Sequence, residues 1–398
     1  APAGVKGRRG GRETFEKGGM AMDLDLYLKQ LEELVNIDSG SRNAAGITKV
    51  AQKLSGWYRD LGWNVETIPL GEETGPVLLI TNRPSDHYDA MFIGHMDTVF
   101  PDGTAAKRPF RIEGENYYGP GVGDMKNGDT AMYHIAANLP REVLDKLSIA
   151  MVYNPDEEIG SVYSRETTDA IGRKADHIFV MESAGQKGTR HCFARKGSLS
   201  YELEFHGQAA HAGFMFEVEN ASAVLEMAHY IVALMGLACR EKDTTVNVGI
   251  AQGGTAKNVV ADFAKISVDM RFKLDEERIR LKEAVHKLTE GEPFVKGVKT
   301  VIAEERENRP LVKTEKTAEF VERMKGLAEE LGILFQEKDR GGLSDANHLA
   351  QCGDVVVLDG MGPHGANDHS EKEYGYIGSV EPCVRLLVRV LQDLAERK

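Results

Sequence analysis

In four stretches of the chain, apolar residues recur every three or four positions, a spacing that places them on one face of a helix. The predicted helices cover residues 24–35, 47–61, 317–331 and 380–397. Gly62 follows the second helix and is a typical C-terminal stop. Each helix therefore has an apolar face that can pack against a common core.

Short apolar runs bounded by turn residues predict β-strands that are buried on both faces. The runs are Val77–Ile80, Ala90–Gly94, Ser148–Tyr153, His177–Met181 and Val355–Leu358. Helical stretches separate these runs, and that alternation favours a mainly parallel sheet. We therefore predict an α/β domain whose sheet carries helices on both faces.

Residues 197–309 show a different pattern. Their predicted strands alternate apolar and polar residues, as the strands of a half-buried sheet do. Their order of strand, helix, strand, strand, helix and strand is that of the ferredoxin-like α+β arrangement. The predicted elements are Ser198–Phe205, Ala221–Cys239, Thr245–Ala251, Lys265–Phe272, Glu276–Leu288 and Gly297–Ala303. The simplest organisation is an α/β domain of residues 20–196 and 310–398, interrupted by this inserted domain.

Composition argues against several classes of partner. The chain has 62 acidic and 49 basic residues, a formal net charge of −13, whereas nucleic acids and anionic membranes require a basic surface. The longest apolar run, Tyr230–Cys239, is shorter than the roughly 18–20 residues of a membrane span. The four scattered cysteines do not form a disulfide or zinc-knuckle pattern, so we expect free thiols and a cytoplasmic protein.

Residues 1–19 differ from the rest of the chain. They hold five basic residues, two acidic residues and six glycines. They lack the apolar segment of a secretory signal. We interpret them as a leader outside the fold, with the natural start near Met20 or Met22.

Metal-ligating side chains stand where the predicted buried strands end. They are His95 and Asp97 after 90–94, Glu157 and Glu158 after 148–153, Glu182 after 177–181, and Asp124 after the glycine-rich loop 118–123. Ligands of open α/β sheets bind beyond the carboxyl ends of the strands, so these side chains are expected to converge. Carboxylates that converge at low dielectric repel one another unless a cation lies between them. The pattern therefore predicts a metal site.

The mixture of imidazole and carboxylate favours zinc, manganese or cobalt over calcium or magnesium. His364 and His369, in a glycine-rich loop after Val355–Leu358, are rival sources of a further nitrogen ligand for a second metal. A phosphate-binding loop at 119–123 is not supported, because the Gly-Lys-Ser/Thr ending and the Rossmann glycine spacing are missing. The sequence also has no Gly-x-Ser-x-Gly motif of a serine hydrolase.

Six motifs occur in order along the chain: Gly94-His-Met-Asp-Thr-Val99, Gly121-Val-Gly-Asp-Met-Lys-Asn-Gly128, Pro155-Asp-Glu-Glu-Ile-Gly-Ser161, Glu182-Ser-Ala184, Ala210-His-Ala-Gly213 and His369-Ser-Glu371. Together they resemble the aminoacylase and carboxypeptidase G family of co-catalytic di-zinc peptidases. The resemblance runs from about residue 24 to residue 395. It implies that the inserted domain is a dimerisation or lid domain, that the protein is a homodimer, and that it cleaves an amide bond beside a free carboxylate.

The resemblance also implies a role for each residue of the metal site. Two zinc ions, replaceable by cobalt or manganese, would be held by Asp124 as the bridge, by His95 with Glu182, and by Glu158 with His369. Asp97 would orient the His95 ring, and Glu157 would be the general base that passes a proton from water to the leaving nitrogen. The resemblance favours His369 over His364 and implies a cis peptide bond between Asp124 and Met125.

On the substrate side, the resemblance implies that His211 reaches into the partner subunit's active site and stabilises the oxyanion. Further substrate-binding residues would be Asn258, the carboxylate-binding Arg309, Arg271 and Gly342 in the loop 341–345. The substrate would be a small peptide or an N-acyl amino acid, as in a glutamate carboxypeptidase. An N-acyl-amino-acid deacylase or a dipeptidase would use the same residues and remains an alternative, as does a metal-binding dimer without activity.

Overall fold

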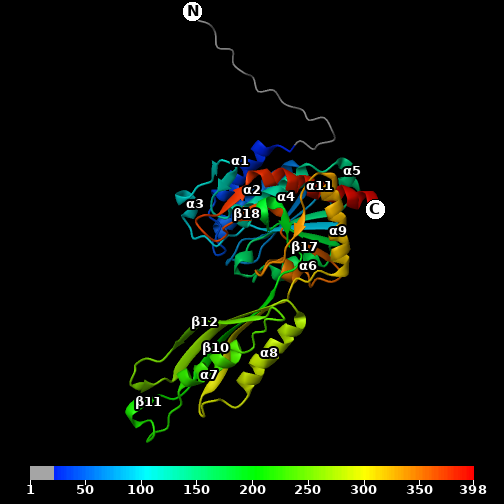
Figure 1. Cartoon of the computed structure of the whole chain (residues 1–398). Helices are drawn as coiled ribbons and strands as arrows, with labels where there is room; N and C mark the ends of the chain where they lie inside the picture. Colours follow the sequence, from blue (N-terminus) through cyan, green and yellow to red (C-terminus); the bar gives the residue numbers. More distant parts are fainter. Residues whose placement is uncertain (1–21) are drawn as a thin grey trace, which may run out of the picture.

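The structure is a computed structural model, and it describes residues 22–398. The leader predicted at residues 1–19 lies outside the described residues. The chain forms two lobes (Figure 1). The larger lobe holds the first and last described segments, and the smaller lobe is built from the middle of the chain.

A six-stranded sheet forms the centre of the larger lobe, in the order β1-β2-β6-β3-β7-β17. Its strands are β1 (Asn64–Ile68), β2 (Val77–Thr81), β3 (Ala90–His95), β6 (Ile149–Asn154), β7 (His177–Val180) and β17 (Val356–Leu358). The pairs β6–β3, β3–β7 and β7–β17 are parallel, whereas β1 and β2 join antiparallel. The predicted α/β fold with a mainly parallel sheet is confirmed.

Helices cover both faces of this sheet. One face packs against α1 (Leu24–Val35), α2 (Ala44–Asp60), α4 (Asn127–Ala137), α9 (Glu315–Glu330) and α11 (Val380–Arg397), and the other against α6 (Arg165–Gly172) and α10 (Ala346–Leu349). Along β3, Phe92 belongs to the first core, whereas Met91 and Ile93 belong to the second. Within residues 22–398, no helix combines the length and the apolar character needed to cross a membrane.

A second sheet of short strands, in the order β4-β5-β19-β18-β8, lies in the same lobe. Its strands are β4 (Arg111–Glu113), β5 (Asn116–Tyr118), β8 (Ser183–Ala184), β18 (Gly362–Ala366) and β19 (Tyr374–Tyr376). The sequence predicted a loop for the whole glycine-rich stretch after β17, and this prediction was wrong for His364, which lies within β18. The backbone there is extended because it pairs with β19 and β8.

The smaller lobe is a four-stranded antiparallel sheet in the order β12-β14-β10-β15. Its elements are β10 (Gly197–His206), α7 (Ala223–Met235), β12 (Thr245–Gly253), β14 (Phe263–Phe272), α8 (Asp275–Glu290) and β15 (Lys299–Asn308). Alternate residues of β14 are buried, and they pack with residues of both helices in one core. The predicted ferredoxin-like insertion is confirmed.

Two segments of the chain cross between the lobes, and they are tied together. The backbone N–H of Arg195 donates to the carbonyl of Leu311 at 3.0 Å. The Asn347 side-chain amide donates to the carbonyl of Lys196 at 3.1 Å and to that of Arg309 at 2.8 Å. Helix α10 (Ala346–Leu349) is thus attached to both crossings.

Candidate metal centre

The metal ligands implied by the resemblance converge beyond the carboxyl ends of the parallel strands. His95 ends β3, Glu158 follows β6, and Glu182 follows β7. Asp124 lies in the helical turn Val122–Lys126 that precedes α4, and His369 lies between β18 and β19. Segments that are far apart in the sequence therefore supply one cluster of side chains.

Asp124 lies between the two histidines of this cluster. Its Oδ1 is 3.1 Å from His95 Nε2, and its Oδ2 is 3.1 Å from His369 Nε2. Glu182 Oε1 lies 3.6 Å from His95 Nε2, and Glu158 Oε2 lies 3.1 Å from His369 Nε2. Two groups result, each with an imidazole, a glutamate and one oxygen of Asp124.

This donor set fits two divalent cations. Ligand atoms of His95, Asp124 and Glu158 lie within 4.8 Å of one another, as do those of His95, Glu157 and Glu182. These sets share His95 and differ from the two groups above, because Glu157 lies as close to His95 and Glu182 as a ligand would. Glu158 Oε1 is buried and, among the described residues, has no hydrogen-bond partner. An imidazole and a carboxylate for each ion, with a carboxylate between them, is chemistry that suits zinc.

Electrostatics also favours cations at this position. Burial, followed by the charge of Asp124, raises the pKa of Glu182 to about 7. Burial likewise raises the pKa of Glu157 and that of Glu158. Burial acts in the same direction on Asp124, but hydrogen bonds with His369 and His95 outweigh it and hold its pKa below the ordinary value. Burial therefore makes the charged form of each glutamate energetically unfavourable, and nearby cations would stabilise that charged form.

Asp97 is fully buried and connects two parts of the cluster. Its Oδ1 lies 3.3 Å from His95 Nδ1, and its carboxylate accepts hydrogen bonds from the backbone N–H groups of Glu157 and Glu158 at 3.1 Å. The hydroxyl of Ser41 donates to it at 2.6 Å. Asp97 therefore fixes both the imidazole ring and the turn that carries the two glutamates. The sequence argument missed Ser41, which no motif marks.

Glu373 holds the backbone around Asp124. Its carboxylate accepts hydrogen bonds from the N–H groups of Gly121 at 2.9 Å, Gly123 at 2.7 Å and Asp124 at 2.9 Å. The sequence argument did not identify this residue either, because the contact joins segments about 250 positions apart. The implied cis peptide bond between Asp124 and Met125 is present.

The rival histidine, His364, forms its hydrogen bond with the backbone of β8. Its Nδ1 lies 3.0 Å from the carbonyl oxygen of Ala184, and its ring is buried. The sheet contact of β18 with β8 fixes it there. Of the two histidines, His369 is the one that the structure places beside Asp124.

A cavity of about 480 Å³ adjoins the metal ligands. Glu157, Glu158 and His369 line one part of it, and the loop 341–345, which includes Gly342, lines another. Arg165 enters from α6, and Arg271 enters from β14 of the inserted lobe. The proposed base, metal ligands and two guanidinium groups thus share one cavity.

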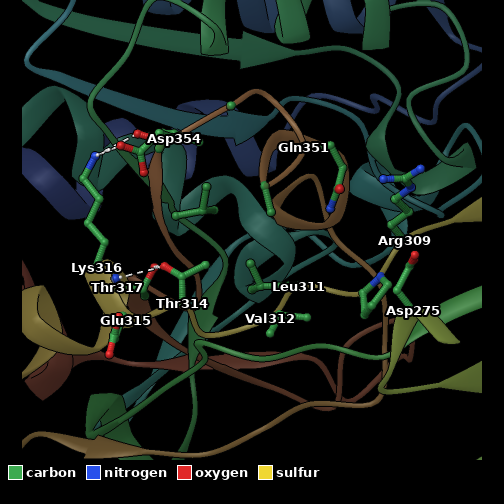
Figure 2. Close-up of a pocket in the computed structure, with 15 residues that line it drawn as sticks. Asp275, Arg309, Leu311, Val312, Thr314, Glu315, Lys316, Thr317, Gln351 and Asp354 are labelled. Atoms are coloured by element: carbon green, nitrogen blue, oxygen red, sulfur yellow. Dashed lines mark hydrogen bonds and ion pairs between the residues drawn. The ribbon is translucent and has the colours of Figure 1, made fainter.

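Arg309 lies elsewhere. It lines a separate cavity of about 440 Å³, together with Asp275, Leu311 and Gln351 (Figure 2). In this arrangement of the lobes, Arg309 and Glu157 therefore line two different cavities. The carboxylate-binding role that the resemblance implies for Arg309 stays a prediction. Of the implied substrate-binding residues, Arg271 and Gly342 are the two that line the cavity beside the metal ligands.

His211 and Asn258 lie together, but far from the metal ligands of their own chain. β11 (Ala210–His211) pairs with β13 (Val259–Val260), and the N–H of Ala212 donates to the carbonyl of Asn258 at 2.9 Å. Both residues are exposed. β11 lies at the end of the inserted lobe that is remote from the six-stranded sheet (Figure 1).

Comparisons with known proteins agree with this architecture. A model described as Peptidase family M20/M25/M40 matches residues 91–393. Carboxypeptidase G2 from Pseudomonas sp. (strain RS-16) is 27% identical over 377 residues, which are 93% of this chain and 90% of that protein. Acetylornithine deacetylase from Erwinia tasmaniensis is 27% identical over 233 residues, which are 55% of this chain and 59% of that protein.

Solved structures share the fold. Aminopeptidase PepT from Bacillus cereus matches with a TM-score of 0.72 at 23% identity, covering 95% of this chain and 100% of that one. An M20-family metallo-carboxypeptidase from Sulfolobus solfataricus matches with a TM-score of 0.68 at 17% identity, covering 93% and 99%. The family model and the curated relatives confirm the resemblance found in the sequence. They also show that the chain is an enzyme of the metallopeptidase and amidohydrolase class. The chain belongs to Peptidase family M20/M25/M40.

Proposed function

We propose that the protein is a two-zinc exo-hydrolase that cleaves an amide bond next to a free carboxylate, as a glutamate carboxypeptidase does. The observation that carries this proposal is the position of Asp124 between His95 and His369, beside a cavity lined by Glu157 and by arginines. The similarity to carboxypeptidase G2 supports the same class of substrate. The four cysteines are free thiols, which fits a reducing compartment, and we propose the cytoplasm.

The positions of the side chains support the roles that the resemblance implies. A zinc pair held by His95, Glu182, Asp124, Glu158 and His369 would polarise the scissile carbonyl and lower the pKa of water. Glu157 lines the cavity and would accept the proton of the attacking water at its carboxylate, then deliver it to the leaving nitrogen. Asp97 would keep the His95 ring and the Glu157 turn in place.

A second candidate is an N-acyl-amino-acid deacylase, because acetylornithine deacetylases are also among the relatives. The zinc-supplemented enzyme is to be assayed on N-acyl-glutamates, acetylated amino acids and dipeptides, each as the free acid and as the C-terminal amide. We expect the highest kcat/KM for the N-acyl-glutamate acid and at least a tenfold loss for its amide, which lacks a charged hydrogen-bond acceptor. Equal rates on acid and amide would contradict an exo-hydrolase.

We also propose a homodimer formed through the inserted domain, 197–309. Strand β12 is an edge strand, with β14 as its one neighbour among the described residues, and Ile250 on it is 52% exposed. On the adjacent helix α7, Leu225, Val232 and Met235 are exposed. An open edge beside an apolar helix face favours pairing with a two-fold mate. Within one chain, His211 and Asn258 lie far from the metal ligands. In the proposed dimer, the partner subunit supplies these two residues to the site.

A mixing experiment tests this assembly. We expect sedimentation to give a dimer, and we expect His211→Ala and Glu157→Gln each to be nearly inactive alone. Co-refolding the two variants should restore activity, because each mixed dimer then contains one site with an intact Glu157 and a His211 from the partner. Activity that stays absent in mixed dimers, or an active monomer near 44 kDa, would contradict the proposal.

A further inference from the structure

His348, on helix α10, lies between two carboxylates. Its Nδ1 is 2.6 Å from Asp169 Oδ1, and its Nε2 is 3.0 Å from Asp345 Oδ1. Its side chain is 9% exposed, so little water reaches these contacts. A neutral imidazole has one N–H group and would direct a lone pair at one of the carboxylates, whereas an imidazolium donates to both. The geometry therefore indicates that His348 carries a proton on each nitrogen.

The charges around this ring favour the same state. Burial lowers the pKa of His348, but hydrogen bonds with Asp169 and Asp345 outweigh burial and raise the pKa to about 9. Arg173 lies 4.0 Å from Asp169 Oδ2, and the Cys352 thiol lies 3.6 Å from Asp169 Oδ1. Burial raises the pKa of Cys352 to about 12, so this thiol stays neutral. The other charged or titratable side chains that line the cavity with His348 are Glu157, Glu158, Arg165, Arg271 and His369. Among the described residues, the two aspartates are the carboxylates within 4.0 Å of the ring nitrogens.

Asp345 connects this histidine to the turn that carries the proposed base. Its Oδ1 accepts a hydrogen bond from the hydroxyl of Ser161 at 2.6 Å, and its Oδ2 accepts one from the side-chain amide of Asn154 at 2.6 Å. Asn154 is the last residue of β6, and Ser161 has a φ of 54°, in the left-handed region that is unfavourable for a residue with a Cβ. Asp345 therefore holds both ends of the segment that carries Glu157 and Glu158.

We propose that His348, in its imidazolium form, is a positioning residue that clamps the loop 341–345 to the turn carrying Glu157. The clamp consists of Asp169, His348 and Asp345. The inference rests on the proposed function, which takes Glu157 as the general base. Asp169 belongs to α6, which packs into the core of the larger lobe and is a fixed point. Loss of one ring proton would leave a buried carboxylate without its donor and break the connection between the loop and the helix.

The clamp has two different pH dependences, one for stability and one for position. In the unfolded chain His348 has its ordinary pKa of 6.5, whereas in the folded chain its pKa is about 9. The stabilising effect is therefore complete below about pH 6.5 and is lost as the pH rises through about 9. Within the folded enzyme the ring remains charged until the pH reaches this raised pKa of about 9, so a change in the position of Asp345 is expected there. A role in stability and a role in positioning thus predict changes over different pH ranges.

The test compares wild type with His348→Leu in the zinc-supplemented whole chain. Hydrogen–deuterium exchange is measured for residues 155–161 and 341–349, and kcat/KM is measured on the N-acyl amino acid that wild type cleaves best. We expect both segments of the variant to exchange severalfold faster and its kcat/KM to fall roughly tenfold to hundredfold, the cost of misplacing reacting groups by about 1 Å. The ratio of wild-type to variant kcat/KM should narrow as the pH rises through about 9, where wild type loses the same clamp.

Asp169→Asn is the second variant, because it keeps both the histidine and the shape of the replaced side chain. Removing one of the two carboxylates lowers the pKa of His348, so kcat/KM should decline at a lower pH than in wild type. His87→Leu is the matched control, since His87 Nε2 lies 3.0 Å from Asp176 in an exposed pair, and it should match wild type in every measurement. Melting temperature and zinc content show whether each variant is folded and loaded, and kinetics are run well below the lowest melting temperature.

Three outcomes of the His348→Leu comparison would each overturn the inference: unchanged exchange in both segments, an unchanged kcat/KM, or a ratio that stays constant as the pH rises through about 9. If this variant does not fold, Asp169→Asn decides, and a decline of its kcat/KM at the wild-type pH refutes the clamp. An enzyme that hydrolyses its substrate equally well with and without His348 keeps the proposed function and refutes the positioning role. A chain that cleaves none of the substrates, but exchanges faster in both segments without His348, keeps the clamp and refutes the proposed function.

Discussion

Exhaustive chelation is expected to abolish turnover, and zinc, cobalt or manganese should restore it. Three glutamates and Asp124 surround two imidazoles, and the chain places no lysine or arginine within 4.0 Å of these carboxylates in the described residues. Removing the cations leaves Glu157 without an activated water and leaves the neighbouring carboxylates to take up protons. Loss of activity should therefore follow metal content.

The measurement is kcat against metal per chain by elemental analysis. Calcium and magnesium serve as controls, because they prefer all-oxygen ligand sets and should not restore activity. The melting temperature should also fall on chelation, since a ligand that binds only the folded state stabilises it. Full activity of a protein shown to be metal-free would refute the two-metal site.

Replacement of Glu157 by glutamine should lower kcat by roughly 10²–10⁴-fold, the range for a lost general base, while both metals stay bound. Glu158→Gln should lose activity and also metal. The two neighbours differ in their contacts: Glu158 Oε2 lies 3.1 Å from His369 Nε2, whereas Glu157 has no contact with His369 within 4.0 Å in the described residues. Kinetics together with metal content separates the two roles.

Glu166→Gln is the matched control, because Glu166 is an exposed glutamate on α6 and should behave as wild type in both measurements. If Glu157→Gln loses metal and Glu158→Gln retains it, the base and the ligand have been assigned the wrong way round. If neither variant changes kcat, the proton is transferred by another group.

The fold could be predicted where apolar periodicity is strong. Helix α11 begins and ends at the predicted residues, and the buried strands β3 and β6 differ from prediction by one residue at their ends. Edge strand β1 and the short strands of the second sheet were missed, because their polar or aromatic residues carry no clear alternation. Strand β18 was missed for a different reason, since pairing with remote segments makes its glycine-rich sequence extended.

For the candidate site, strand ends and motifs indicated which side chains come together, because the residue that ends a strand is fixed by local chain position. The supporting contacts could not be predicted in this way. Ser41 and Glu373 act across long stretches of sequence, and Arg165 is placed by the turn after β6 and by Asn308 of the other lobe. The direction of Arg309 likewise depends on how the chain crosses between the lobes, which a motif does not specify.

The contacts of Glu373 have a consequence for the order in which the protein matures during synthesis. Asp124 lies in the first third of the chain, yet both His369 and the carboxylate that holds the Asp124 loop come from the last 30 residues of sequence. A nascent chain that ends before residue 369 lacks one proposed ligand and the carboxylate that anchors the proposed bridging ligand. The proposed zinc site is therefore complete only after residues 369–373 have been translated, and a product truncated before them would lack one of its five proposed ligands.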